Sequence, residues 1–96
     1  MMEMSGKVIA VIRAYPKDIV NDFTELVRKL EERLPKDKYS IVKWEPVDIA
    51  FGYRALEIYF LMPEELEGGT EELENIVKSI EDIDNVDVVY VSRIQT

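Results

Sequence analysis

The residue types in this chain restrict the chemistry that it can perform. The sequence contains no histidine and no cysteine, so the usual general base near neutral pH, the commonest metal ligand and the thiolate nucleophile are all missing. A hydrolytic triad is therefore excluded, as are a disulfide framework and a thiolate metal site. We therefore expect no metal site in this chain.

Two neighbouring segments have residue types that could bind ions. Gly68-Gly69-Thr70 precedes an amphipathic stretch, and free N–H groups at a helix start attract anions. The segment lacks the lysine and the spacing of a P-loop, however, and a turn with a helix cap accounts for it fully. Acidic residues cluster around it, namely Glu64, Glu65, Glu67, Glu71 and Glu72. The cluster lacks the alternating spacing of a calcium loop, so we interpret it as a solvated acidic rim.

Three further residues are candidates for contacts with a partner. Gly52 lies in a short connection between two predicted strands, where it can supply an unusual backbone angle. Phe51, beside it, is either a core residue that caps the fold or an exposed anchor of the kind that dominates interface energies. Arg93 follows an apolar strand, either as a solubilising charge or as a functional cation.

The first half of the chain predicts a strand and a helix. A continuous apolar run predicts a central strand over residues 7–15. A helical apolar stripe follows, and Pro35 ends it. Asp22 and Glu25 have the spacing of a capping box at its start, with Asp18 as the other candidate. The stripe consists of Phe23, Leu26, Val27, Leu30 and Leu34.

The second half predicts three more strands and one more helix. Residues 39–49 are a strand candidate, which Pro46 either assigns to a sheet edge or splits. The next strand covers 55–62, and its inward-facing residues are Leu56, Ile58, Phe60 and Met62. Thr70 is the expected N-cap of the second helix, whose stripe is Leu73, Ile76, Val77 and Ile80. Asp84-Asn85 is the expected turn into a last strand over 86–93, where the Val88-Val89 doublet indicates a bulge.

This order of elements predicts the fold class. A β-α-β-β-α-β chain with right-handed crossovers gives an α+β ferredoxin-like sandwich, with a four-stranded antiparallel sheet and two helices on one face. Ninety-six residues allow one modest core. We expect a single domain over residues 1–96, with residues 1–6 as a loose N-terminus.

The alternation of side chains also predicts an apolar outer face on the sheet. The residues expected to point away from the helices are Ile9, Val11, Tyr59, Leu61 and either Val89 or Tyr90. This is more apolar surface than solvation requires. It is either ordinary surface, the contact with a second copy in a homo-oligomer, or a docking face for a partner.

Charge and hydropathy limit the classes of partner. The formal net charge is −8, which opposes binding to phosphate backbones, and residues 54–60 lack the aromatic pattern of an RNA-recognition strand. We expect no nucleic-acid binding. No apolar run approaches the roughly 18 residues that span a bilayer, and residues 1–6 lack the features of a signal peptide. We therefore expect no membrane contact and a cytoplasmic location.

Several short motifs carry a family resemblance over roughly residues 7–94. They are Ile49-Ala50-Phe51-Gly52, Ala55-Leu56, Met62-Pro63, Glu67-Gly68-Gly69-Thr70 and the stretch from Val86-Asp87-Val88 to Ser92-Arg93. In this order and spacing, they resemble the guanine-nucleotide exchange domain of the translation elongation factor 1-beta family, in its short archaeal-type form. Family members often have a proline directly before Ile-Ala-Phe-Gly, whereas here Asp48 stands there and the proline is Pro46.

The resemblance implies a function and roles for the candidate residues. It implies an exchange factor, not an enzyme, that promotes GDP release and GTP reloading on the GTPase elongation factor 1-alpha during translation elongation. Such a factor performs no covalent chemistry and needs no cofactor of its own. Phe51, Gly52 and Tyr53 would dock onto the GTPase. Arg93 matches a lysine that, in the eukaryotic branch, intrudes on the magnesium site of the GTPase. Arginine keeps the charge but presents a planar fork instead of a compact ammonium.

A second reading of the same fold remains open. A ferredoxin-like module that forms oligomers or senses a small molecule would use the apolar sheet face as a subunit interface. Such a module would change its oligomeric state with a ligand, whereas an exchange factor would accelerate GDP release from the GTPase.

Overall fold

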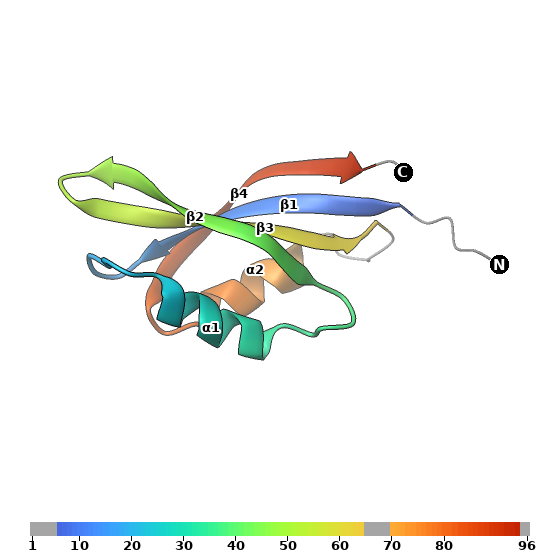
Figure 1. The fold of residues 1–96 in the computed structure, drawn as a ribbon, viewed down its shortest axis with the longest axis horizontal. Coiled ribbons are helices and arrows are strands. Elements are labelled where there is room, and N and C mark those ends of the chain that lie inside the picture. The colour runs from blue at the N-terminus through green and yellow to red at the C-terminus, as the bar shows by residue number, and fades with distance from the viewer. Residues whose placement is uncertain (1–5, 65–69, 95–96) are drawn as a thin grey trace.

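The predicted elements all form, in the predicted order. The computed structural model describes residues 6–64 and 70–94, which form four strands and two helices, drawn as a ribbon in Figure 1. Their bounds are β1 Lys7–Pro16, α1 Thr24–Arg33, β2 Ser40–Ala50, β3 Tyr53–Pro63, α2 Glu71–Lys78 and β4 Ile83–Ile94. The strands form one antiparallel sheet in the order β2-β3-β1-β4. The ferredoxin-like α+β fold is confirmed.

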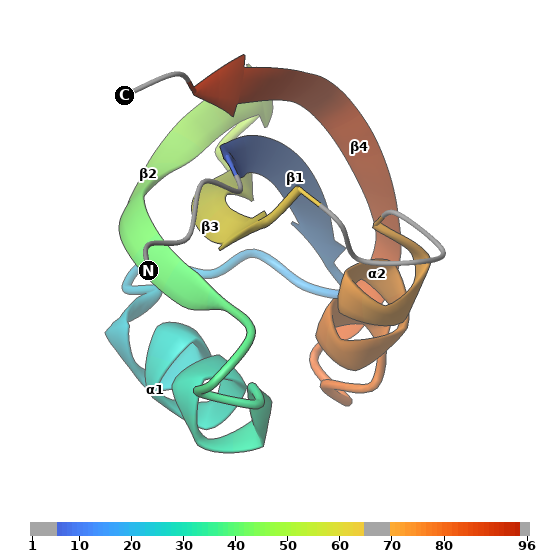
Figure 2. The same ribbon diagram turned by 90° about the vertical axis from the view of Figure 1, so that its right-hand side faces the viewer.

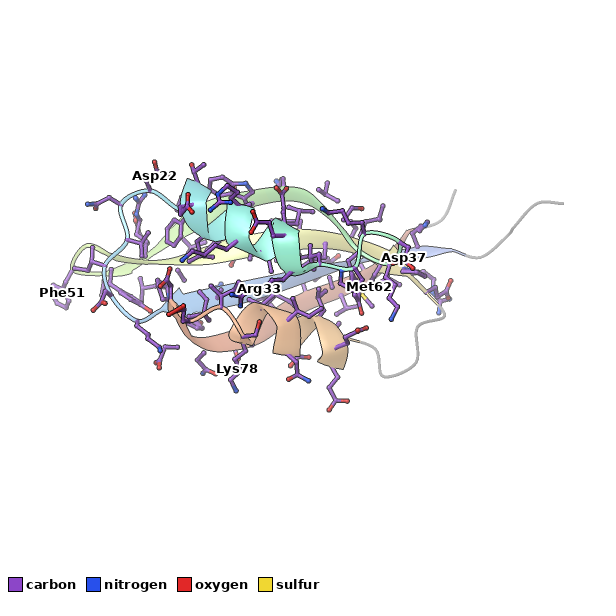
Figure 3. The ribbon with its side chains drawn as sticks, turned by 90° about the horizontal axis from the view of Figure 1, so that it is seen from below. Asp22, Arg33, Asp37, Phe51, Met62 and Lys78 are labelled. Atoms are coloured by element: carbon purple, nitrogen blue, oxygen red, sulfur yellow. The ribbon has the colours of Figure 1, made fainter. Side chains whose placement is uncertain are left out.

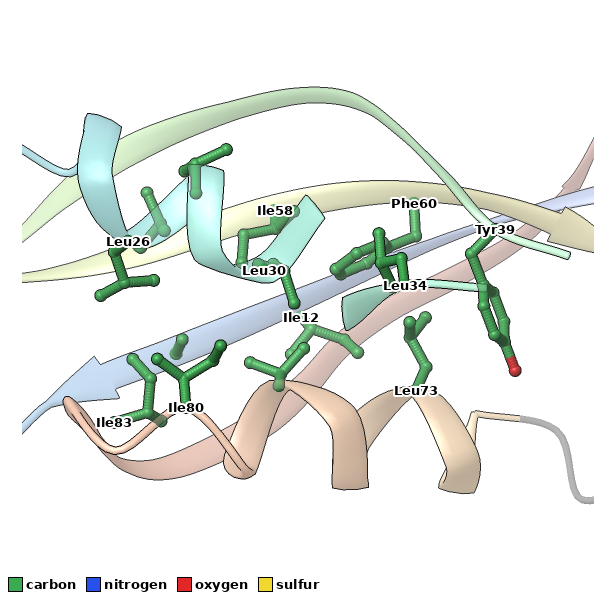
Figure 4. Close-up of a cluster of buried hydrophobic side chains, with 14 of the residues drawn as sticks. Ile12, Leu26, Leu30, Leu34, Tyr39, Ile58, Phe60, Leu73, Ile80 and Ile83 are labelled. Carbon is green, nitrogen blue, oxygen red and sulfur yellow. The ribbon is translucent and has the colours of Figure 1, made fainter. Parts of the chain in front are cut away.

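One apolar core lies between the sheet and the two helices, which cover the same face (Figure 2). Figure 4 shows side chains of α1 and α2 that point toward β1 and β3. The predicted inward residues of 55–62 and most of both helical stripes are buried. The buried cluster contains Ala10, Ile12, Ala14, Phe23, Leu26, Val27, Leu30, Leu34, Tyr39, Leu56, Ile58, Phe60, Met62, Leu73, Val77, Ile80 and Ile83. The helical and strand periods therefore select the core correctly.

The sheet order agrees with the strand assignments. β1 pairs with β3 on one side and β4 on the other, so the continuous apolar run occupies a central strand. β2 pairs with β3 alone, and Pro46 lies within it opposite Leu56. The expected edge position is confirmed, and the proline does not split the strand. An edge strand tolerates proline because one side of its backbone needs no ladder hydrogen bonds.

The start of α1 differs from the predicted cap, whereas the N-cap of α2 is the predicted residue. Asp22 Oδ1 accepts hydrogen bonds from Thr24 Oγ1, at 2.7 Å, and from the Thr24 N–H, at 3.0 Å, and both lower the pKa of Asp22. Glu25 pairs with Arg28 instead of reaching back, so the expected capping box does not form. Thr70 is the N-cap of α2, as predicted, but its hydroxyl donates to Glu74 Oε2 at 2.7 Å. Nearby charged side chains compete for the polar groups at both helix starts.

The start of β4 corrects one prediction. Asp84-Asn85 is not a turn, because the strand begins at Ile83 and Asn85 pairs with Tyr15. The chain turns earlier, between α2 and Ile83, where the Ile83 N–H donates to the Ile80 carbonyl at 3.0 Å. Ile80 and Ile83 are both buried. Because both side chains are buried, the chain turns before Asp84-Asn85, the polar pair that indicated a turn.

The bulge predicted in β4 is confirmed. Val88 lies opposite Ile12 and Tyr90 lies opposite Val11, which leaves Val89 as the extra residue. Residues on either side of the bulge are exposed along this edge strand, from Val88 to Val91.

The outer face of the sheet combines the predicted apolar residues with tyrosines and charged side chains. Val11 lies directly between Tyr59 of β3 and Tyr90 of β4 and is only 4% exposed. Beside it, Arg13 Nη2 pairs with Glu57 Oε2 at 2.6 Å. Lys43 Nζ lies 4.6 Å from the centre of the Tyr59 ring. Tyrosines and charged groups therefore cover much of the apolar strip on this face.

Candidate partner-binding site

The β2–β3 hairpin presents Phe51 at the tip of the molecule. Ala50 pairs with Tyr53, so Phe51 and Gly52 form a two-residue turn, with φ of +50° and +82°. Positive φ at both central positions is the conformation of a type I′ hairpin turn. The Phe51 side chain is 101% exposed, and Figure 3 shows it at the end of the hairpin, away from the helices. Of the two readings of Phe51, the core residue is therefore wrong.

The fold alone gives no reason for phenylalanine at this position. A residue with a Cβ in the left-handed region costs roughly 1–2 kcal/mol, which is why asparagine and glycine usually occupy such turns. An exposed Phe side chain also forgoes the roughly 2–3 kcal/mol that its burial would contribute. Strain of this kind concentrates at functional sites. Phe51 has the features of an anchor for a partner, and Gly52 beside it adopts its own positive φ without strain.

Two side-chain hydrogen bonds hold the base of the hairpin to the rest of the protein. The Tyr53 hydroxyl donates to the Pro16 carbonyl at 2.7 Å, and Arg54 Nη2 donates to the Asn21 carbonyl at 3.0 Å. Partial burial, followed by the charges of Asp84 and Tyr15, raises the pKa of Tyr53. Tyr53 thus orients the hairpin through its hydroxyl, while Phe51 beyond it faces solvent.

Ile49 belongs to the same exposed tip. It is the extra residue at another irregularity of the sheet, because Asp48 pairs with Arg54 and Ala50 with Tyr53. Ile49 is 45% exposed, whereas Phe51 is fully exposed. Irregularities of this type twist a strand and redirect its side chains. The tip therefore presents two apolar side chains on a hairpin that is anchored at its base.

Arg93 lies at the other end of the sheet. It pairs with Val8 in the register of β4 on β1, and its Nη2 lies 2.8 Å from Glu64 Oε2. The Arg93 side chain is 63% exposed and that of Glu64 is 28% exposed. The cation is thus fixed at one point and otherwise open to solvent.

The structure does not bring Phe51 and Arg93 together. Arg93 lies beside Val8, whereas the hairpin base is tied to Pro16, eight residues along β1. Eight residues of strand span about 26 Å. Figure 1 shows the β2–β3 turn and the C-terminal end of β4 at opposite ends of the long axis. The candidate residues therefore form two separate sites.

The acidic rim predicted around the second helix has more structure than expected. Glu64 pairs with Arg93, and Glu72 accepts hydrogen bonds from the Tyr39 hydroxyl at 2.8 Å and from Lys38 at 3.3 Å. Sequence reasoning did not find these partners, because each pair joins segments about thirty residues apart. Residues 1–5, Glu65, Glu67, Gly68 and Gly69 lie outside the described residues.

Two features are absent from the described residues. Over residues 6–64 and 70–94, no group of three or more acidic side chains is placed to hold a metal ion. Neither helix in these ranges has the length and apolarity needed to cross a membrane.

Comparison with known proteins identifies the family. The EF-1 guanine nucleotide exchange domain family matches residues 9–94, a span that contains both Phe51 and Arg93. Elongation factor 1-beta of Hyperthermus butylicus is 42% identical over 93% of this chain and 96% of its own length. The same factor of Thermofilum pendens is 44% identical, over 92% and 96%, and that of Staphylothermus marinus is 44% identical, over 93% and 98%. The chain belongs to the EF-1 guanine nucleotide exchange domain family, and its role is guanine nucleotide exchange in translation elongation.

Proposed function

We propose that this chain is the exchange factor for the GTPase elongation factor 1-alpha and promotes GDP release and GTP reloading on it. The observation that carries the proposal is Phe51, a fully exposed aromatic residue held at positive φ on an anchored hairpin. Family membership indicates the kind of partner that such an anchor serves. Because the reaction serves translation, we propose the cytoplasm as its location.

The thermodynamic basis of exchange is linkage between two ligands of the GTPase. A partner that binds the nucleotide-free GTPase more tightly than the GDP-bound form weakens GDP binding by the same factor. The exchange factor needs no covalent step for this, only differential affinity for the two states. Such a mechanism suits a chain without histidine or cysteine, and we propose that it uses no cofactor of its own.

Docking is the proposed task of the hairpin tip. Phe51 would insert into an apolar pocket of the GTPase, where a buried aromatic anchor contributes much of the binding energy. Gly52 has no side chain, so the partner can approach the backbone closely at this point. Tyr53, at the base of the hairpin, would keep the tip in one orientation through its hydrogen bond to the Pro16 carbonyl.

Disturbance of the nucleotide site is the proposed task of Arg93. Its guanidinium would approach the region that holds magnesium and the GDP phosphates, where a positive charge competes with the bound cation. The guanidinium also matches phosphate and carboxylate groups well, because its N–H donors form a planar fork. Since Arg93 and Phe51 lie at opposite ends of the sheet, we propose that they contact two different surfaces of one GTPase.

A nucleotide-release assay tests the proposal. Elongation factor 1-alpha loaded with fluorescent GDP is mixed with excess GTP, and the decay of fluorescence is followed at increasing concentrations of this chain. We expect the release rate to rise and saturate, with the maximal rate reporting exchange and the half-saturating concentration reporting docking. A release rate that does not change with the chain would contradict the proposal, and ligand-dependent oligomerisation in sedimentation experiments would then favour the sensing module.

A further inference from the structure

Arg93 is held by an acidic residue from a different strand end. In the sheet, β1 lies between β3 and β4, and Glu64 directly follows β3 at Pro63. Lys7, at the start of β1, pairs with both Pro63 and Ile94. This register brings the ends of β3 and β4 to the same edge of the fold. The ion pair between Arg93 Nη2 and Glu64 Oε2, at 2.8 Å, joins these two ends across β1.

Glu64 is the better-fixed partner of the pair. Its backbone N–H donates to the Gly6 carbonyl at 3.2 Å, which extends the β1–β3 ladder by one step. Its side chain is 28% exposed, against 63% for Arg93. The Glu64 carboxylate thus holds the long, solvent-exposed Arg93 side chain in a defined position. The backbone at the end of an edge strand does not fix that side chain by itself.

The geometry leaves Arg93 able to bind a second anion. The ion pair joins the carboxylate to Nη2 of the guanidinium, and a guanidinium has five N–H donors. The remaining donors belong to a group that is mostly exposed to solvent. Arg93 is therefore held through its guanidinium while most of its side chain stays open to solvent.

We propose that Glu64 is a positioning residue for exchange: its carboxylate orients the Arg93 guanidinium toward the magnesium and phosphate region of the GTPase. This inference rests on the proposed function of Arg93. A side chain that is already oriented loses less rotamer freedom when it engages its target. Glu64 acts through Arg93 and makes no contact with nucleotide or cation itself.

The test combines Glu64→Ala with Arg93→Ala in the nucleotide-release assay. An exposed ion pair has a modest effect, so we expect Glu64→Ala to lower the maximal release rate about three- to fivefold. The half-saturating concentration should stay unchanged, because the hairpin tip is intact. Glu64→Gln, which keeps an acceptor oxygen, should lie between wild type and Glu64→Ala. In the Arg93→Ala background, Glu64→Ala should have no further effect, since coupled residues are not additive.

A matched control and a second measurement complete the experiment. Glu32→Ala removes a comparable exposed ion pair, that of Glu32 with Arg28 in α1 at 2.6 Å, and should leave the release rate unchanged. Arginine ¹⁵N spectra of the free chain should show restricted motion at the Arg93 Nε–H. In Glu64→Ala this restriction should be lost.

The outcomes separate this inference from the proposed function. A wild-type chain that fails to accelerate release contradicts the exchange proposal and the inference together. An active wild type with unchanged Glu64→Ala activity overturns the inference alone. The inference is also overturned if Glu64→Ala lowers the release rate further in the Arg93→Ala background, which indicates a structural effect. It is likewise overturned if Glu64→Ala accelerates exchange, which indicates that Glu64 restrains Arg93.

Discussion

At position 51 the requirements of the fold and of binding oppose each other. The turn favours asparagine or glycine at positive φ, whereas the residue present is a phenylalanine with a fully exposed ring. Removing the ring therefore costs the folded state no packing. Stability and function should respond to substitution in opposite directions.

Phe51→Asn measures this opposition. We expect its free energy of unfolding to rise by about 1 kcal/mol, because asparagine adopts the left-handed conformation with less strain. We also expect the half-saturating concentration in the release assay to rise more than tenfold, as for the loss of an interface anchor. Urea denaturation and the release assay provide the two values. A variant that unfolds several kcal/mol more easily, as after loss of a buried Phe, would contradict this account.

Arg93 is the second residue whose proposed role can be isolated. We expect Arg93→Ala and truncation after Ser92 to keep the fold and the half-saturating concentration, because the hairpin tip lies at the other end of β1. The maximal release rate should fall toward the unassisted rate, while Arg93→Lys should retain much of the activity because its charge remains. Release measured with and without excess magnesium checks this prediction. Equal acceleration by all variants would leave docking as the whole mechanism.

At the scale of the elements, Tyr39 ties the start of β2 to the start of α2. Its side chain is 3% exposed, and its hydroxyl donates to Glu72 at 2.8 Å. Burial, and then the hydrogen bond to the Glu72 carboxylate, raise the pKa of Tyr39 to about 12. The same hydrogen bond, and then that from Lys38, lower the pKa of Glu72.

Tyr39→Phe should reveal this tie as a pH-dependent loss of stability. At pH 8 we expect the variant to unfold more easily by about 1 kcal/mol, the usual contribution of one such hydrogen bond. The difference from wild type should shrink between pH 10 and 12, because there the unfolded tyrosine has lost its proton while the folded one has not. It should also shrink as the pH falls below 4.5, because there the unfolded Glu72 binds a proton before the folded one, whose pKa is lowered.

Denaturant unfolding of both proteins across this pH range gives the comparison directly. All other residues are the same in both proteins, so the difference between the two curves isolates Tyr39. A constant difference from pH 4 to 12 would show that the hydrogen bond does not depend on either ionisation.

At the scale of the whole molecule, shape and charge both bear on the partner. The extents are 51 × 22 × 21 Å, so the two proposed sites lie at the ends of a narrow body. A single large partner can reach both ends, and a GTPase with separate surfaces for docking and nucleotide binding fits that requirement. The net charge of −8 makes a phosphate backbone an unfavourable partner for the same body.

The charge yields a prediction about nucleic acids. We expect no binding to RNA or duplex DNA at physiological salt, because the acidic protein cannot release counterions from a phosphate backbone. Fluorescence anisotropy with labelled RNA and DNA oligonucleotides checks this over a range of salt concentrations. A micromolar complex whose affinity falls steeply with salt would contradict it.

The order of the elements, the inward-facing residues and the bulge in β4 could all be read from the sequence. Each depends on a local property, such as the two-residue period of 55–62, the helical stripe that begins at Phe23, or the Val88-Val89 doublet. Local periods determine which side of an element is apolar, and that side must enter the core. The net charge, and the absence of histidine and cysteine, are likewise properties of the sequence alone.

Only the tertiary structure decided whether Phe51 is buried or exposed, because that depends on where the hairpin ends relative to the helices. It also placed the turn before Ile83, because the packing of that side chain outweighed the turn propensity of Asp84-Asn85. The pairing of Glu64 with Arg93 has the same origin. This contact joins residues that are distant in the chain, and only the register of the sheet brings them together.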